Sequence, residues 1–291
     1  MTEDVPRRAV VAGVDGSIPS TDAVRWAARE AVRRAVPLLL LNSVFIPSPE
    51  PYVPFRLPRS YGDALREQGV EWLNEAEKAA QESADGVCVR TEQRIGPAAG
   101  HLVRLGDSAE LLVVGSRGLG AVAGLLLGSV AVEVSAGARC PVVVVRGRTP
   151  ESAPPETGPV VVGVDGSVHG AAPVAFAFDL AAAWGAPLMA VHAAFRSGAV
   201  MPEHARRRLR DGAARYPGVE LSECIVRDRA ARGLLEVADG ARLVVVGARG
   251  RGGFTGLTLG STSQAVLHHA SCPVGIVRAA TRLGPDTVEA R

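Results

Sequence analysis

Two stretches of the chain carry glycines at the same spacing. The first, from Gly115 to Ala131, reads GSRGLGAVAGLLLGSVA, and the second, from Gly247 to Ser263, reads GARGRGGFTGLTLGSTS. Both follow the pattern G-x2-G-x9-G-S, and each comes after an apolar run typical of a buried strand. Glycine lets the backbone approach an anion closely, and the free N–H groups at the start of a following helix point toward it. The spacing therefore predicts two phosphate-binding loops.

A second motif, V-D-G-S, also occurs twice, at Val14–Ser17 and Val164–Ser167. It follows the first apolar run of each half, so its aspartate should lie at the carboxyl end of a strand. In a doubly wound sheet, ligands bind at this edge, where the strand order reverses. If the first and fourth strands are neighbours, the V-D-G-S motif and the glycine loop meet in one crevice. The alternative interpretation of Asp15 and Asp165 is an Asp-Gly turn without a ligand.

Other site chemistries are disfavoured by the residue types. No Gly-Lys-Ser/Thr follows the glycines, which argues against a Walker loop, and the glycines come too late in the chain for a dinucleotide fingerprint. The four cysteines contain no C-x-x-C pair, so we expect buried thiols and no metal site. His192 ends a predicted strand, but its counterpart Asn42 cannot ionise, so we expect a hydrogen-bonding role at the strand end and no catalytic residue.

The chain is a tandem repeat whose elements alternate between strand and helix. V-D-G-S recurs at an offset of 150, whereas from Gly86 onward the offset is 132, so the first half has 18 extra residues, most of which we place in Ile46–Ser60. The predicted strands of the first half are Arg8–Val14, Pro37–Val44, Val87–Ile95, Glu110–Val114 and Val142–Val145, and the predicted helices are Pro19–Ala35, Tyr61–Ser83, Pro97–Gly106 and Ser129–Ala136. The second half repeats this order from Val160 to Val277. The pattern predicts two α/β domains with doubly wound parallel sheets covered by helices on both faces.

The domain boundaries follow from composition. We expect a first domain at residues 1–147, a polar, proline-rich linker at 148–158, a second domain at 159–280 and a tail at 281–291. The last strands, Val142–Val145 and Val274–Val277, would form apolar sheet edges. We expect these edges to pair with each other within the chain or with a second chain in a homodimer.

The composition limits the partners. With 32 basic and 30 acidic residues the chain gives no global electrostatic argument for binding nucleic acid. No apolar run reaches the roughly 18 residues that a membrane span needs, and the start of the sequence lacks an apolar signal. We therefore expect a cytoplasmic protein with neither a nucleic-acid nor a membrane partner.

The duplicated loops, the V-D-G-S motifs and the Cys-Pro-Val before each last strand resemble the universal stress protein family, in its ATP-binding subclass. The resemblance covers nearly the whole chain twice, as in tandem-domain members. It implies a five-stranded parallel sheet of order 3-2-1-4-5 in each domain, ATP in the crevice with or without Mg²⁺, and pairing through the last strands.

The resemblance also implies the residues of each site. In the first half these are Gly13, Asp15, Gly16, Ser17, Ser43, Val114, Gly115, Ser116, Arg117, Gly118, Gly128, Ser129 and Val130. In the second half they are Gly163, Asp165, Gly166, Ser167, Ala193, Val246, Gly247, Ala248, Arg249, Gly250, Gly260, Ser261, Thr262 and Ser263. Ser43 and Ala193 would border the adenine, and the glycine loops would hold ribose and phosphate.

The two sites differ after the last Gly-Ser of the loop. The second half continues Thr262-Ser263, with hydroxyls for phosphate, whereas the first continues Val130-Ala131. We therefore expect the second site to bind ATP more tightly. The predicted function is that of a nucleotide-dependent regulator in stress or growth arrest and not an enzyme. The alternatives are a slow ATPase or nucleotidyl-transfer enzyme on the same fold and a cyclic-nucleotide sensor.

Overall fold

The computed structural model describes residues 8–45, 59–120, 127–149, 152–194, 200–250 and 259–279. The chain forms two compact units, Met1–Val134 and Ser135–Arg291. Most of the expected insertion and all of the expected tail lie outside the described residues, as do parts of the linker and of both glycine loops. The predicted boundary between the domains stays a prediction.

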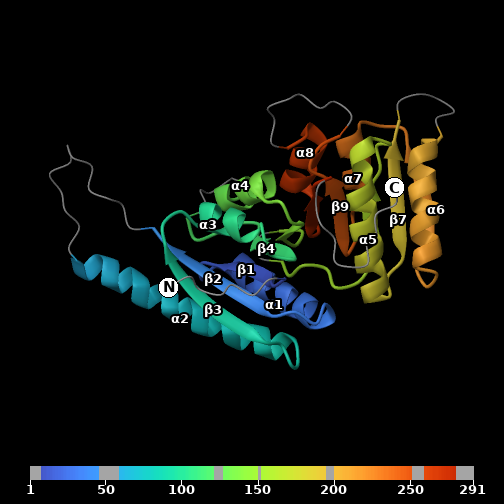
Figure 1. Ribbon diagram of the computed structural model, residues 1–291. Helices are drawn as coiled ribbons and strands as arrows, with labels where there is room; N and C mark the ends of the chain where they lie inside the picture. The colour runs from blue at the N-terminus through green and yellow to red at the C-terminus, as the bar shows by residue number, and fades with distance from the viewer. Residues whose placement is uncertain are drawn as a thin grey trace, which may run out of the picture. The chain divides into compact units, whose positions relative to one another are not determined.

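The first unit contains four parallel strands in the order β3-β2-β1-β4 (Figure 1). Its elements are β1 (Val10–Val14), α1 (Ile18–Arg33), β2 (Leu38–Val44), α2 (Arg59–Ser83), β3 (Val89–Ile95), α3 (Ala98–Leu105) and β4 (Leu111–Gly115). A further helix, α4 (Ser129–Gly137), continues into the second unit. The strand order reverses between β1 and β4, so the carboxyl ends of these two strands form the predicted crevice edge.

The second unit has the strand order β5-β10-β9-β6-β7-β8. Its elements are β5 (Val142–Val145), β6 (Val160–Gly163), the 3₁₀ turn η1 (Val168–Gly170), α5 (Ala171–Trp184), β7 (Leu188–Ala193), α6 (Glu203–Arg215), β8 (Leu221–Val226), α7 (Ala230–Val237), β9 (Leu243–Gly247), α8 (Ser261–His269) and β10 (Val274–Val277). Strands β6 to β10 are the five strands of the second repeat, and they follow the order 3-2-1-4-5. The doubly wound fold expected from the sequence is confirmed.

The helices cover both faces of each sheet because the crossovers run in two directions. In the second unit, α5 packs against α6 and against β6, β9 and β10, whereas α7 packs against α8 and β7. In the first unit, α1 packs against α2, while α3 packs against β1 and β2. With right-handed crossovers, the helix between the third and fourth strands must lie opposite the helices that connect the first three.

The last strands of the two repeats pair with each other. Strand β5 lies antiparallel to β10, with Val144 opposite Val274 and Val142 opposite Ile276. Val143 and Val144 are fully buried, as is Val274. The intrachain pairing predicted for these strands is confirmed, and it satisfies the backbone groups that an open apolar edge would expose.

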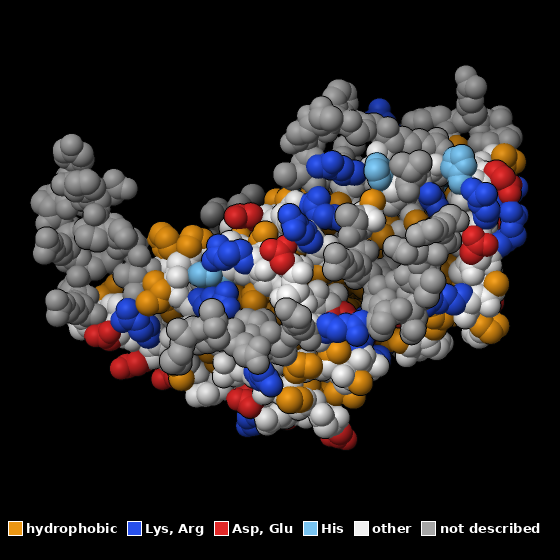
Figure 2. Space-filling model, in the orientation of Figure 1, with side chains coloured by type: hydrophobic (Ala, Val, Ile, Leu, Met, Phe, Trp, Pro, Cys, Tyr) orange, Lys and Arg blue, Asp and Glu red, His pale blue; other side chains and the backbone are white. Residues whose placement is uncertain are grey.

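Large apolar side chains fill the interior of each unit, and the surface is mixed. Phe176 in α5 is 1% exposed, and a Cβ added to Gly275 of β10 would lie 3.4 Å from its ring. On the face drawn in Figure 2, basic side chains occur in several groups with acidic and apolar side chains among them. Within the described part of the chain, no helix is long and apolar enough to cross a membrane.

The sequence analysis expected all four cysteines to be buried, but only two of them are. Cys140 and Cys272, which precede β5 and β10, are buried, but Cys88 is exposed and Cys224 is partly exposed. Cys88 lies just before β3, whose residues Arg90, Thr91 and Glu92 form a hydrophilic strand with partly or fully exposed side chains. The sequence analysis expected buried thiols, but a strand at the end of the sheet order leaves this one open to solvent.

This difference predicts a graded reactivity of the thiols. Burial raises the pKa of the Cys272 thiol to about 12, so its reactive thiolate is scarce at neutral pH. In the folded protein, a thiol reagent at pH 8 should modify Cys88 within minutes and Cys272 only after unfolding. Mass spectrometry of labelled peptides measures both rates, and rapid labelling of Cys272 in the folded protein would contradict this assignment.

Candidate functional site

In the first unit, the V-D-G-S motif and the glycine loop meet, as predicted. The hydroxyl of Ser17 donates to Asp15 Oδ1 at 2.6 Å and lies 3.3 Å from the carbonyl oxygen of Arg117. The other carboxylate oxygen of Asp15 accepts a hydrogen bond from the backbone N–H of Leu119 at 3.2 Å. Asp15 therefore links the end of β1 to the loop after β4.

Two glycines in this region are required by space or by backbone geometry. Gly16 has a φ of +81°, which side-chain-bearing residues rarely adopt, and a Cβ there would meet the indole of Trp72. A Cβ on Gly118 would overlap with Asp15 Oδ2. The Asp-Gly pair thus forms the tight turn of the alternative interpretation and also contributes its carboxylate to the loop, while contact of Asp15 with a nucleotide stays a prediction.

The second unit contains a cavity of about 530 Å³ at the carboxyl ends of β6, β7 and β9. This volume is in the range of small-molecule sites, roughly 300–1,000 Å³. The predicted residues that line it are Gly163, Asp165, Ser167, Ala193, Val246, Gly247, Arg249, Gly250, Gly260, Ser261, Thr262 and Ser263. Residues of both the V-D-G-S motif and the glycine loop therefore line this cavity, as the sequence predicted.

Two predicted residues of the second half do not line the cavity. Gly166 has a φ of +72° and makes the turn that sets Asp165 and Ser167 in place. Ala248 is 2% exposed, and its N–H donates to the carbonyl oxygen of Val277 at 2.8 Å. Both residues support the site without facing it.

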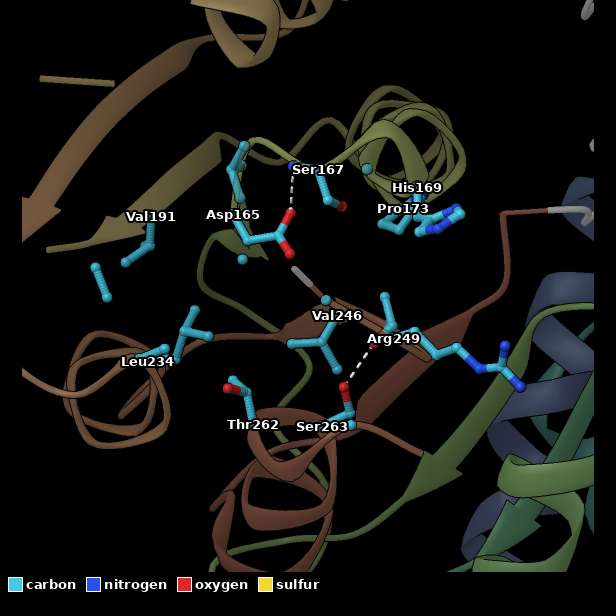
Figure 3. A pocket seen from close by; sticks show the side chains of 18 of the residues that line it. Asp165, Ser167, His169, Pro173, Val191, Leu234, Val246, Arg249, Thr262 and Ser263 are labelled. Atoms are coloured by element: carbon cyan, nitrogen blue, oxygen red, sulfur yellow. Dashed lines mark hydrogen bonds between the residues drawn. The ribbon is translucent and has the colours of Figure 1, made fainter. Parts of the chain in front are cut away.

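The cavity has an apolar end and a polar end. Val191 and Leu234 lie together at one end, as Figure 3 shows. Asp165 and Ser167 lie across the cavity from Thr262 and Ser263 at the start of α8. The side chain of Arg249 extends away from these groups. Burial, together with the charge of Arg249, lowers the pKa of Arg278, which follows β10.

The start of α8 supplies hydrogen-bond donors to the polar end. Gly260 is the residue before the helix, and no side chain caps it. The first N–H groups of a helix have no partner within the helix, and they carry a partial positive charge. The N–H of Gly260 donates to the carbonyl oxygen of Ala248 at 2.8 Å, and Gly128 donates to Ser116 over the same distance in the first repeat. Both loops are therefore closed in the same way just before their helix.

The serine hydroxyls of the site are not equally able to donate to a ligand. A hydroxyl carries one proton, and Ser263 gives it to the carbonyl oxygen of Gly247 at 2.6 Å. Ser43 likewise donates to the carbonyl oxygen of Gly96 at 2.7 Å. In the described arrangement the proton of Ser263 therefore already holds the loop, and its donation to phosphate stays a prediction.

Ser167 differs from its counterpart Ser17. The Ser167 Oγ atom is buried and has no hydrogen-bond partner in the part of the chain that the structure describes, although Ser167 lines the cavity. Ser17 Oγ instead accepts from the N–H of Ser20 at 3.3 Å and caps α1.

The different hydrogen bonding of Ser17 and Ser167 comes from the start of the helix that follows each serine. In the first repeat α1 begins at Ile18, directly after Ser17. In the second repeat a 3₁₀ turn comes first, α5 begins only at Ala171, and glycine occupies position 170, which corresponds to Ser20. The helix start therefore does not use the Ser167 hydroxyl.

His192 has the role that its counterpart predicted. Its Nδ1 donates to the carbonyl oxygen of Val164 at 2.7 Å, and Asn42 Nδ2 donates to the carbonyl oxygen of Val14 at 2.9 Å. Since a carbonyl oxygen can only accept, Nδ1 carries the ring proton in this arrangement. The two side chains bind the end of the second strand to the end of the first.

Some residues of the cavity are not among the nucleotide-binding residues that the resemblance implies. They are Val164, His169, Gly170, Pro173, Val191, His192, Ala230, Leu234 and Leu259. Ala230 and Leu234 belong to α7, which carries no motif, and only the strand order places this helix over the cavity. The V-D-G-S motif could have indicated Val164, since it contains this residue. No group of three or more metal-binding side chains is found among the described residues.

Comparison with known proteins agrees with this architecture. A sequence model of the universal stress protein family matches residues 6–146 and again residues 156–278. The chain belongs to the universal stress protein family.

Relatives in this family match over nearly the full length. A universal stress protein of Mycobacterium tuberculosis is 36% identical over 294 residues, which cover 96% of this chain and 99% of the relative. One of Mycolicibacterium smegmatis is 36% identical over 298 residues, with the same coverage. The crystal structure of a universal stress protein from Archaeoglobus fulgidus covers 94% of this chain and 100% of its own, with a TM-score of 0.71 and 18% identity, and so shares the fold. The double match of the family model shows that this chain contains two universal stress protein domains.

Proposed function

We propose that this universal stress protein binds ATP in the cavity of the second unit and acts in the cytoplasm as a nucleotide-dependent regulator of the stress response. One observation carries the proposal. The cavity has the size of a small-molecule site, and its polar end combines the start of α8 with the unpartnered hydroxyl of Ser167. A buried hydroxyl without a partner is costly, so a ligand acceptor at this position would stabilise it.

The two ends of the cavity suit the two ends of a nucleotide. The apolar end, with Val191 and Leu234, offers a surface for the adenine ring. The carboxylate of Asp165 can accept hydrogen bonds from ribose hydroxyls, while Ser167 and the N–H groups of Ser261 and Thr262 can donate to phosphate oxygens. Asp165 is the one carboxylate among the described lining residues, so it is the candidate for contact with a Mg²⁺ that enters with the phosphates.

The first repeat forms a second, weaker ATP site in this proposal. Ser17 already donates its proton to Asp15, so this hydroxyl has none for phosphate. Asp15 also holds the N–H of Leu119, which removes a donor from the glycine loop. The sequence analysis expected the second site to bind ATP more tightly because of Thr262 and Ser263. The hydrogen bonds of Ser17 and Ser167 give better support for this difference in affinity.

We infer a binding role and not catalysis. The ring of His192 is tied through Nδ1 to Val164, and one carboxylate oxygen of Asp165 accepts from the N–H of Ser167 at 2.8 Å. These hydrogen bonds hold both side chains at the cavity wall, which is a binding role, and released phosphate measures whether either side chain also acts as a general base.

Native mass spectrometry of the purified protein tests the proposal. We expect ATP to co-purify or to bind when added, with one equivalent held more tightly than a second. Competition with cyclic AMP and measurement of released phosphate test the two alternatives. A protein that binds no added ATP would overturn the proposal, stronger binding of cyclic AMP would make it a cyclic-nucleotide sensor, and sustained phosphate release would make it an ATPase.

A further inference from the structure

The first repeat supplies a cation to helix α8 of the second repeat, whose start lines the cavity. Arg146, the residue after β5, donates from Nη1 to the carbonyl oxygens of Leu267 at 2.8 Å and of His268 at 3.0 Å. These carbonyls belong to the last turn of α8. Both partners lie in the second compact unit.

The pairing of β5 with β10 brings Arg146 to this position. The two strands are antiparallel, and Val142 to Val144 lie opposite Ile276 to Val274. Arg278, the equivalent residue after β10, makes a similar contact from Nε to the carbonyl oxygen of Ala138 at 2.7 Å. Ala138 directly follows α4, so each repeat provides an arginine to the helix that precedes the other repeat's last strand.

The guanidinium group of Arg146 lies where its charge can stabilise the carboxyl end of α8, opposite the end that lines the cavity. The last carbonyls of a helix carry a partial negative charge that a cation stabilises, and its first N–H groups attract an anion. The helix has nine residues, and its first three line the cavity. Burial, with smaller contributions from His269 and Arg146, lowers the pKa of His268, which disfavours a positive charge on this ring.

We propose that Arg146 is a positioning residue for the phosphate end of the second-repeat site: it fixes the carboxyl end of α8 and compensates its dipole, while the first turn of the same helix binds the nucleotide phosphates. The proposal rests on the proposed function, because it assigns phosphate to the start of α8. It also means that the second-repeat site depends on a strand of the first repeat.

The full-length variants Arg146→Gln and Arg146→Lys test this role. Glutamine keeps an N–H donor without the charge, and lysine keeps the charge without the paired contact. Arg146→Gln should weaken ATP binding by about two- to fivefold, the effect of one charge at a helix terminus, and Arg146→Lys should restore part of the loss. Adenosine, which has no phosphate, should bind both variants as it binds the unchanged protein.

The binding midpoint is measured as ATP-dependent protection from hydrogen exchange in peptides that cover residues 259–270, which isolates the second-repeat site. Arg148→Gln is the matched control, because Arg148 is two residues away and forms an exposed ion pair with Asp239. It should leave the midpoint for ATP unchanged. An Arg146→Gln midpoint equal to that of the control, or an equal loss for adenosine and ATP, would overturn the proposal. A protein that shows no ATP-dependent protection at all would instead overturn the proposed function.

Discussion

Replacing Ser167 with alanine is expected to weaken ATP binding at the second-repeat cavity by about tenfold or more, because a hydrogen bond to a charged group contributes about 1.5–3 kcal/mol. The free energy of unfolding should stay the same or rise slightly. The variant removes a buried hydroxyl that has no partner among the described residues. Isothermal titration calorimetry with ATP and urea unfolding without it measure the two effects.

The same substitution at Ser17 should give the opposite pattern of effects. Ser17 caps α1 and donates to Asp15, so Ser17→Ala should lower the free energy of unfolding by about 0.5–2 kcal/mol, as the loss of a helix cap does. It should change ATP affinity at the second-repeat cavity little. If Ser167→Ala binds ATP as tightly as the unchanged protein, the hydroxyl does not contact the nucleotide.

Replacing Phe176 with alanine should have the largest effect on stability. The ring is 1% exposed and lies under the central part of the second unit's sheet, beside Gly275. Truncating such a ring removes buried apolar surface and leaves a cavity, which costs about 3–5 kcal/mol. Urea unfolding followed by circular dichroism measures the loss.

Phe45 provides the control for this change. Its side chain is 63% exposed, so Phe45→Ala should change the free energy of unfolding by less than about 0.5 kcal/mol. Similar losses for both variants would mean that Phe176 does not stabilise the interior more than a surface phenylalanine does.

The sequence predicted the alternation of elements and the edge at which the site lies. The reason is local: the β-branched runs form strands, and Asp-Gly and the spaced glycines mark where the strands end. Each strand of the first repeat was placed within two residues of its observed bounds, as for Arg8–Val14 against Val10–Val14. Because the repeat is internal, each motif was tested twice within the same chain, and Asn42 correctly indicated the role of His192.

What the sequence could not predict depends on atoms that meet through the fold. Ser17 and Ser167 occur in the same V-D-G-S motif, and their different hydrogen bonds arise from the helix start that follows. The contact of Arg146 with α8 joins residues 121 and 122 positions apart, and it exists only because β5 pairs with β10. A sequence motif assigns residues to a loop, but it does not show which of their hydroxyl groups already donate hydrogen bonds within the protein.

The pairing of β5 with β10 also bears on how the chain could be divided. Strand β5 belongs to the first repeat by sequence, yet it lies in the second compact unit and precedes the linker expected at residues 148–158. A protease that cuts this linker would leave two fragments still joined by a buried strand pair and by the arginine contacts on either side of it. Cutting the linker would thus separate the two repeats covalently without giving two independent proteins. A fragment that starts after the linker would lack β5, which is one strand of the second unit.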